Sequence, residues 1–262
     1  MAAEPSTATV AERNATGLYC YGVMSAESAP TSGAGGIGGA AVESVREGKL
    51  AALTSRIGST KVRATRRDLL RHSEVLLKAL DRGTVLPLRF GVVFDSEEAL
   101  LDDFLRPRHD ELMGLLRDLE GRVELRVTAF YREEEILAEV VHANPRIAKL
   151  RAATRDADAA ATYPFRLELG ELVAAEVDAR TRRDRQELLE RLRPLSLAAE
   201  VEDEPIEHQV LRASFLVERR HVPAFDEAMD SLARRHAERI HFKYVGPLPP
   251  HSFVSLDGEG GR

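Results

Sequence analysis

The sequence predicts an α+β protein with two lobes, and three observations lead to that prediction. Several short segments alternate apolar and polar residues with the period of a half-buried strand, whereas others carry apolar residues at helical spacing. Between residues 17 and 131 these segments follow in the order strand, strand, helix, strand, helix, strand. A long helical stretch then leads, from residue 194 onward, to a smaller set of strands with one amphipathic helix.

The first lobe begins with two expected strands, at residues 18–24 and 50–57. The segment between them, 28–41, is rich in glycine, serine and alanine and is expected to be a flexible loop. Thr65 and Asp68 have the spacing of a capping box at the start of a helix. That helix is expected to place five leucines on one face: Leu69, Leu70, Leu76, Leu77 and Leu80.

Residues 83–94, GTVLPLRFGVVF, form the most apolar stretch of the chain. They predict a strand buried on both faces, with Pro87 at an edge position and Gly91 at a bulge or close backbone approach. Arg89 interrupts this stretch, and a guanidinium there must reach the rim, pair with a carboxylate or contact a partner. An internal ion pair or a side chain that extends to solvent is the simpler explanation.

A helical region at 96–120 follows, with a kink expected at Pro107. Residues 122–131 alternate strictly and predict a half-buried strand. The order of elements resembles a modified ferredoxin-like sandwich, with helices on one face of a mostly antiparallel sheet.

The second half is expected to contain a long helix from Pro164 to about Arg193, whose middle, ARTRRDRQE, is nearly all charged. We expect that middle to be exposed or paired with another chain. Strands are expected near 195–201, at 209–218 and at 239–245, with an amphipathic helix at 222–238. Gly246 and the prolines after it are not expected to continue the last strand, so the tail should leave in extended form.

These elements divide the chain into four parts. Residues 1–16 are expected to be a disordered N-terminus, and residues 17–131 the N-terminal α+β ferredoxin-like domain. Residues 132–193 are expected to be a helical connector, and residues 194–262 a C-terminal α+β domain with an extended tail.

Composition limits the classes of function. The chain has 262 residues and a net charge of −6, with basic and acidic residues intermixed, so it shows no electrostatic footprint for nucleic acid or anionic membrane. Aromatic residues make up 5% and tryptophan is absent, which disfavours a stacking surface for single strands. The single cysteine, Cys20, rules out a disulfide framework and makes the cytoplasm the expected location. No run approaches the apolar length of a spanning helix.

The sequence offers no catalytic constellation. Residues 33–38 match G-x-G-x-x-G, but at least eight residues separate them from the preceding strand and no clear helix follows, so a loop is favoured over a dinucleotide site. The histidines form no metal-binding cluster, and no G-x-S-x-G elbow occurs. We therefore expect no enzyme activity, no metal and no cofactor.

Four segments occur in the order GLYCYGVM at 17–24, VLPLRFGVVF at 85–94, VELRV at 123–127 and KYVGPLPPHSF at 243–253. Together they resemble the gas vesicle protein F/L family (GvpF/GvpL). The resemblance extends from Gly17 to Leu256. One departure is His251, where the family pattern favours an aromatic residue such as tyrosine.

The resemblance implies an accessory or minor structural protein of gas vesicle formation. Its implied partners are the small hydrophobic shell protein and other gas vesicle accessory proteins, with no nucleic acid and no membrane, and its implied location is the cytoplasm and the gas vesicle. The expected partner contacts are Arg89, Arg180, Arg182, Arg183 and Arg185. The alternatives are a small-molecule enzyme or ligand-binding protein of ferredoxin-like α+β type, with Arg89 and a histidine facing a pocket, and an RNA-binding module with a basic sheet face.

Overall fold

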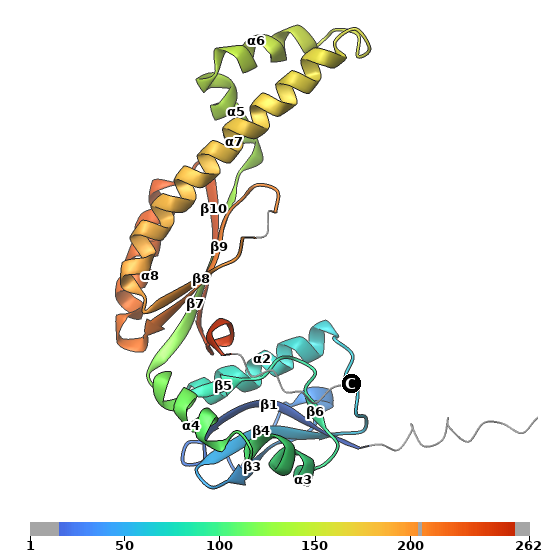
Figure 1. Cartoon of the computed structure of the whole chain (residues 1–262), viewed down its shortest axis with the longest axis vertical. Coiled ribbons are helices and arrows are strands. Elements are labelled where there is room, and N and C mark those ends of the chain that lie inside the picture. Colours follow the sequence, from blue (N-terminus) through green and yellow to red (C-terminus); the bar gives the residue numbers. More distant parts are fainter. Residues whose placement is uncertain (1–15, 204–205, 255–262) are drawn as a thin grey trace, which may run out of the picture. The chain divides into compact units, whose positions relative to one another are not determined.

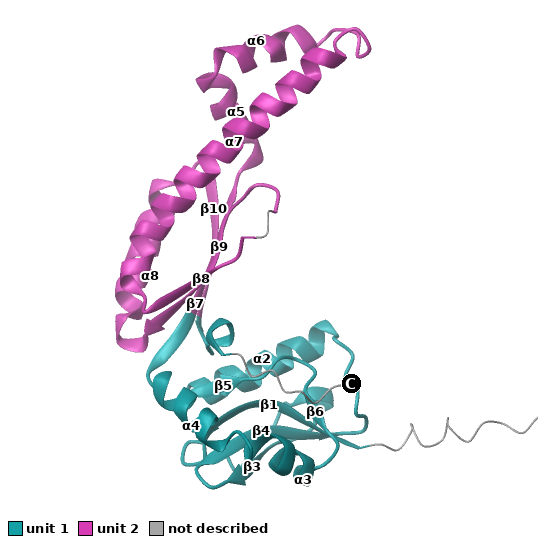
Figure 2. Ribbon diagram, in the orientation of Figure 1, with its two compact units in different colours: residues 1–124, 247–262 teal, residues 125–246 magenta. Residues whose placement is uncertain are grey.

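A computed structural model describes residues 16–203 and 206–254. The chain separates into two compact units, one formed by residues 1–124 and 247–262 and the other by residues 125–246 (Figure 2). Both contain helices and an antiparallel sheet, so the predicted α+β class is confirmed. The expected disordered segment, 1–16, lies outside the described residues except for Thr16.

Unit 1 contains the larger sheet, with the strand order β2-β3-β4-β1-β5 and β6 also paired to β1 (Figure 1). Its strands are β1 (Gly17–Ser25), β2 (Ser32–Gly33), β3 (Val42–Glu47), β4 (Leu50–Ile57), β5 (Val85–Pro87) and β6 (Val93–Phe94). The central strands β1 and β4 are antiparallel, with Gly17 opposite Ile57 and Ser25 opposite Leu50. The loop between β1 and β3 contains the short 3₁₀ helix η1 (Ile37–Gly39).

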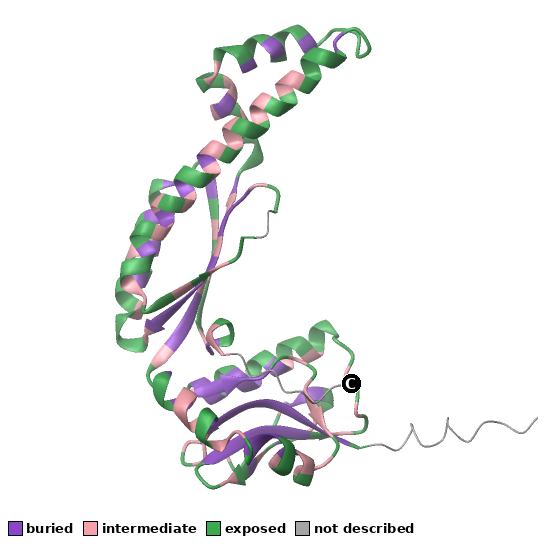
Figure 3. Ribbon diagram, in the orientation of Figure 1, coloured by how far each residue is buried: buried purple, intermediate pink, exposed green. Residues whose placement is uncertain are grey.

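Helices cover both faces of this sheet, which corrects the expectation that they lie on one face. Consecutive residues of β1 and β4 are buried, so each face of these strands packs against something (Figure 3). Helix α2 (Arg66–Leu80) covers one face; α3 (Glu97–Leu100), the π-helical turn η2 (Leu101–Leu105) and α4 (His109–Asp118) cover the other (Figure 1). Helix α2 starts as predicted, because the Thr65 hydroxyl accepts the Asp68 N–H.

Two sequence expectations for these helices have different outcomes. Pro107 does interrupt the helical region, since η2 and a turn separate α3 from α4. The leucine face of α2 was assigned too widely. Leu76 and Leu80 are buried, whereas Leu69, Leu70 and Leu77 are 43%, 54% and 38% exposed. The positions i, i+4 and i+8 that face the sheet are His72, Leu76 and Leu80 instead.

Unit 2 holds a second antiparallel sheet with the order β10-β7-β9-β8. Its strands are β7 (Arg122–Tyr131), β8 (Ala198–Val201), β9 (Gln209–Glu218) and β10 (Ile240–Leu248). The helix α8 (Val222–Arg235) packs on this sheet through Phe225, whose ring lies 5.2 Å from Phe215 and 6.0 Å from Tyr244. Strand β10 runs through Gly246 and Pro247, so the expectation that these residues cannot continue it is wrong.

Three further helices complete unit 2: α5 (Glu133–Ala143), α6 (Pro145–Thr154) and α7 (Tyr163–Leu192). The long helix α7 packs against β9 and α8 with its C-terminal half, and α5 and α6 pack against its N-terminal half (Figure 1). Residues 132–193, expected to be a connector, therefore fall inside unit 2. A short 3₁₀ turn, η3 (Arg193–Leu195), follows α7, and η4 (Arg219–His221) precedes α8. The turn η5 (His251–Phe253) lies near the end of the described chain.

Candidate functional site

Arg89 lies on a bulge at the edge of the larger sheet. Leu88 N–H donates to the Tyr21 carbonyl at 2.9 Å, and Cys20 N–H donates to the Val92 carbonyl at 3.0 Å. Since Tyr21 and Cys20 are neighbours on β1, residues 89–91 are extruded between two ladder positions. The expectation of one continuous strand buried on both faces is therefore wrong, because the apolar stretch forms β5 and β6 on either side of this bulge.

The bulge brings Arg89 to the surface, where its side chain is exposed. Gly91 has φ +98°, a conformation that favours glycine, so its predicted role at a bulge is confirmed. Pro87 is the last residue of β5, which is an edge strand as predicted.

Tyr19 and His72 support the bulge through hydrogen bonds and ring contacts. The Gly91 N–H donates to the Tyr19 hydroxyl at 3.2 Å, and that hydroxyl lies 2.7 Å from His72 Nδ1. The Phe90 ring lies 5.9 Å from Tyr19 and 5.8 Å from His72. Burial is the main cause that lowers the pKa of His72, to about 4, with the nearby charge of His251 second. The imidazole is therefore neutral near pH 7, and its hydrogen bond with Tyr19 joins two uncharged side chains.

A second hydrogen-bonded chain fixes the glycine-rich loop. The Ile37 N–H donates to the Tyr21 hydroxyl at 2.8 Å, Tyr21 contacts Ser55 Oγ at 2.9 Å, and Ser55 donates to the Ala41 carbonyl at 2.7 Å. Gly36 approaches this chain so closely that a Cβ there would lie 2.4 Å from Ser55 Oγ. The G-x-G-x-x-G segment is preceded by β2 and followed by η1 and β3, so it lacks the strand-to-helix turn of a dinucleotide site.

The arginines of α7 differ sharply from one another in environment. Arg180 is buried, and its guanidinium donates to Glu139 at 3.0 Å and to Glu176 at 2.5 Å. Arg185 donates to the Val210 carbonyl at 2.9 Å, within unit 2. Both side chains therefore make contacts inside the unit.

Arg180 belongs to a charged network that joins four elements of unit 2. Arg239, just before β10, donates to Asp184 of α7 at 2.6 Å and to Glu139 of α5 at 3.3 Å. The Tyr131 hydroxyl of β7 also donates to Asp184. Desolvation is the largest cause that raises the pKa of Tyr131, followed by its hydrogen bond to Asp184. The charged middle of α7 is thus largely a structural connection among α5, α7, β7 and β10.

Arg182 and Arg183 lie on the exposed side of the same helix. The first turns of α7 also expose three large apolar side chains: Tyr163 at 67%, Phe165 at 48% and Leu167 at 54%. Figure 3 shows this half of the helix as mainly exposed and intermediate, in contrast to the buried strands of the sheet. Tyr163 and Leu167, four positions apart, lie on one face of the helix, whereas Phe165 lies on the opposite side. Exposed apolar side chains that share a face are typical of a contact surface for another protein.

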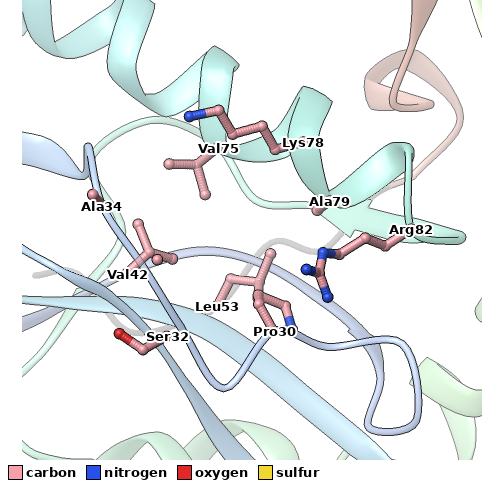
Figure 4. Close-up of a pocket in the computed structure, with 10 residues that line it drawn as sticks. Pro30, Ser32, Ala34, Val42, Leu53, Val75, Lys78, Ala79 and Arg82 are labelled. Atoms are coloured by element: carbon pink, nitrogen blue, oxygen red, sulfur yellow. The ribbon is translucent and has the colours of Figure 1, made fainter.

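A pocket of about 240 Å³ lies in unit 1, between α2, the sheet and the loop after β1 (Figure 4). It is lined by Pro30, Ser32, Gly33, Ala34, Val42, Leu53, Val75, Lys78, Ala79 and Arg82. Neither Arg89 nor a histidine lines it. It is therefore different from the pocket that the enzyme alternative requires, which Arg89 and a histidine would face. In the part of the chain that the structure describes, no three His, Cys, Asp or Glu side chains are grouped to hold a metal.

The segment after β10 returns to unit 1 through Ser252. Its N–H and hydroxyl donate to the two carboxylate oxygens of Glu124, at 2.8 and 3.1 Å. Glu124 is fully buried. Sequence reasoning missed this contact, and it also missed the Tyr19–His72 pair. The only available signals were the alternation of Tyr19 and Tyr21 and the place of His72 one turn before Leu76.

None of the helices in the described ranges combines the length and apolar character needed to span a membrane. The family model described as gas vesicle synthesis protein GvpL/GvpF matches residues 17–255. The chain is 37% identical to gas vesicle protein F of Streptomyces sp. (strain CB03234), over 90% of this chain and 98% of that protein. It is 26% identical to gas vesicle protein L2 of Halobacterium salinarum, over 91% of each chain.

Solved structures agree with these sequence matches. The crystal structure of gas vesicle protein GvpF from Anabaena sp. PCC7120 has a TM-score of 0.78 and 25% identity, and the match covers 92% of this chain and 99% of that one. The GvpF structure from Microcystis aeruginosa, at 24% identity and a TM-score of 0.75, shares the fold. The family match extends over both compact units, from β1 to the segment that contacts Glu124. This chain therefore belongs to the GvpL/GvpF family of gas vesicle synthesis proteins.

Proposed function

We propose that this chain is a cytoplasmic accessory protein of gas vesicle assembly that binds the small apolar shell protein and other accessory proteins. Family membership supports the gas vesicle role. The observation that supports shell binding is the pair of exposed apolar side chains on one face at the start of α7, Tyr163 and Leu167. A shell protein must shield apolar surface before it is assembled, and an apolar surface on a carrier lowers its tendency to aggregate.

The arginines expected to contact partners are proposed as further contacts, and they belong to both units. Arg182 and Arg183 are exposed on the same helix, and Arg89 is exposed on the bulge of unit 1. Arg180 and Arg185 contribute indirectly, because their contacts keep α7 in place. Charge reversal of Arg180 would not test partner binding cleanly, because it leaves a buried charge without a partner and so destabilises the fold.

Capture of the shell protein tests this proposal. The shell protein is co-expressed with the tagged chain, and the amount recovered is compared among wild type, Tyr163→Ser with Leu167→Ser, Arg182→Glu with Arg183→Glu, and Arg89→Ala. We expect the apolar double variant to lose most of the captured shell protein, because surface contacts of this type contribute through burial of apolar area.

Matched controls come from the same unit. Leu197, just before β8, is 52% exposed, so Leu197→Ser controls for loss of an exposed apolar side chain. Arg191→Glu with Arg193→Glu controls for charge reversal near the end of the helix. Equal capture by wild type and the apolar double variant would remove α7 from the contact surface. Absence of capture by the wild-type chain would reject the proposal itself.

A further inference from the structure

The pocket in unit 1 has a floor that is already formed by buried apolar side chains. Val42 of β3 and Leu53 of β4 come from the sheet, and Val75 and Ala79 come from α2; all four are at most 6% exposed. The loop through Pro30 and Ala34 forms the opposite side (Figure 4). Such a site does not need to reorganise its core in order to receive an apolar group.

The mouth of the pocket carries two positive charges without carboxylate partners. Lys78 and Arg82 are four positions apart on and just after α2, and both line the pocket. Figure 4 shows the Arg82 side chain directed toward the loop at Pro30. Throughout ranges 16–203 and 206–254 neither cation forms an ion pair, although Arg71 on the same helix pairs with Glu74. Figure 4 shows the Lys78 amine directed away from Arg82, so Arg82 is the cation that an anion bound in the hollow would meet.

The C-terminal end of a helix favours cations through its dipole, which accounts for the charge of these two residues. The dipole does not explain why the Arg82 side chain lies over an apolar hollow. The volume of about 240 Å³ exceeds the cavity of roughly 150 Å³ that accepts benzene, and it is smaller than the pockets of about 300–1,000 Å³ that hold drug-sized ligands. The size therefore fits a compact ligand of about ten non-hydrogen atoms.

We infer that this pocket binds a small organic carboxylate with a compact apolar body. The apolar part lies on Val42, Leu53, Val75 and Ala79, and the carboxylate lies against the Arg82 guanidinium. This site belongs to unit 1, whereas the α7 residues proposed to contact the shell protein belong to unit 2, so the two proposals are tested separately.

Benzoate is a suitable probe, with benzyl alcohol as the neutral control and benzylamine as the cationic control. The full chain is titrated with each compound while the methyl signals of Val42, Leu53 and Val75 are followed by NMR. We expect saturable benzoate binding with a Kd of about 1 mM, weaker in high salt because the anion contacts are near the surface. Benzyl alcohol should bind about tenfold more weakly, and benzylamine should not bind.

Three variants identify the residues responsible. Arg82→Gln should weaken benzoate binding several-fold and Lys78→Gln less, whereas Arg67→Gln, a change of an exposed cation of α2 outside the pocket, should leave it unchanged. Ala34→Leu should obstruct the pocket and weaken benzoate and benzyl alcohol alike. Equal affinity for benzoate and benzyl alcohol, an equal effect of Arg82→Gln and Arg67→Gln, or shifts confined to methyl groups outside the pocket would overturn the inference.

Discussion

At the scale of single residues, buried polar side chains of unit 1 are organised around two tyrosines of β1. Tyr19 links the Arg89 bulge to His72 of α2, and Tyr21 links the glycine-rich loop to Ser55 of β4. Each hydroxyl has partners at both ends, which satisfies polar groups that would otherwise be costly to bury. The tyrosines thus hold two loops that carry no apolar core of their own.

The neutral state of His72 predicts a dependence of stability on pH. Its folded-state pKa, about 4, lies below the usual value of 6.5, so the unfolded chain binds a proton first as the pH falls. The stabilisation is complete above about pH 6.5 and is lost progressively between about pH 6.5 and 4, by up to about 3 kcal/mol. Urea unfolding at pH 7.5, 6.5 and 5.5 should show this decline.

In His72→Phe the decline should be much shallower than in wild type over this range. His221→Gln serves as the control, because His221 is an exposed side chain of η4. The groups that face His72 are Tyr19, Tyr21, Phe90 and the nearby His251. Identical pH profiles for wild type and His72→Phe would show that His72 titrates normally.

The structure leaves no room for a side chain at position 36, which is glycine. A methyl group there would meet Ser55 Oγ at 2.4 Å and the Tyr21 hydroxyl at 2.7 Å. Gly36→Ala should therefore lower the free energy of unfolding by about 1–3 kcal/mol, as for overpacking in a core. Gly33→Ala is the matched control, since no atom lies within 4 Å of its added methyl group. Thermal unfolding of both variants measures the difference, and equal stability would contradict the close approach.

At the scale of elements, α7 has two halves with different environments. Its C-terminal half buries Leu188 and Leu192 and contributes Arg180 and Asp184 to the charged network. Its N-terminal half, apart from contacts with α5 and α6, exposes apolar side chains. The sheet and α8 therefore hold the C-terminal half, whereas α5 and α6 hold the N-terminal half on one side and leave Tyr163 and Leu167 exposed.

Arg180→Gln should destabilise unit 2 by about 2 kcal/mol. The change removes hydrogen bonds from a charged donor, while Glu139 and Glu176 remain partly hydrated and so limit the loss. Arg182→Gln, on the exposed side of the same helix, should change stability by less than about 0.5 kcal/mol. Urea unfolding compares the two; a similar small effect for both would mean that the network contributes little net stability.

The edge of the larger sheet formed by β5 and β6 is irregular, and this affects whether another strand can pair with it. A regular edge strand can pair with a strand of another chain. Here the bulge at residues 89–91 and Pro87 interrupt the row of backbone groups that such pairing needs. The edge therefore disfavours strand addition and instead displays the Arg89 side chain.

At the scale of the whole molecule, unit 1 is built from both ends of the chain. The Ser252 N–H and hydroxyl satisfy the carboxylate of Glu124, which is fully buried. Residues 247–253, PLPPHSF, of the last shared segment are thus part of the first unit's structure, and this gives a physical reason for a family match that reaches residue 255.

Removing residues 247–262 should destabilise unit 1 more than any single change in that segment, because a buried carboxylate loses its donors. Ser252→Ala should cost about 1–2 kcal/mol, since the backbone N–H bond to Glu124 remains. Ser196→Ala, whose hydroxyl bonds only the Arg193 carbonyl at an exposed site, is the control. Hydrogen exchange of the β1 and β4 amides measures these effects; unchanged protection after truncation would contradict the structural role of the segment.

The sequence by itself determined the α+β class, most helices and strands, the start of α2 at Thr65, the interruption at Pro107 and the family. These follow from local periodicity, capping and proline geometry, which act over a few residues. Tertiary structure alone decided the extrusion of Arg89, the burial of Arg180 and the contact of Ser252 with Glu124. Each depends on segments that meet across long separations: 72 residues for Tyr19 with Gly91, 41 for Glu139 with Arg180 and 128 for Glu124 with Ser252. Local patterns carry no information about which distant partner completes a hydrogen bond, so a charged helix face looks the same in sequence whether it is solvated or paired inside the protein.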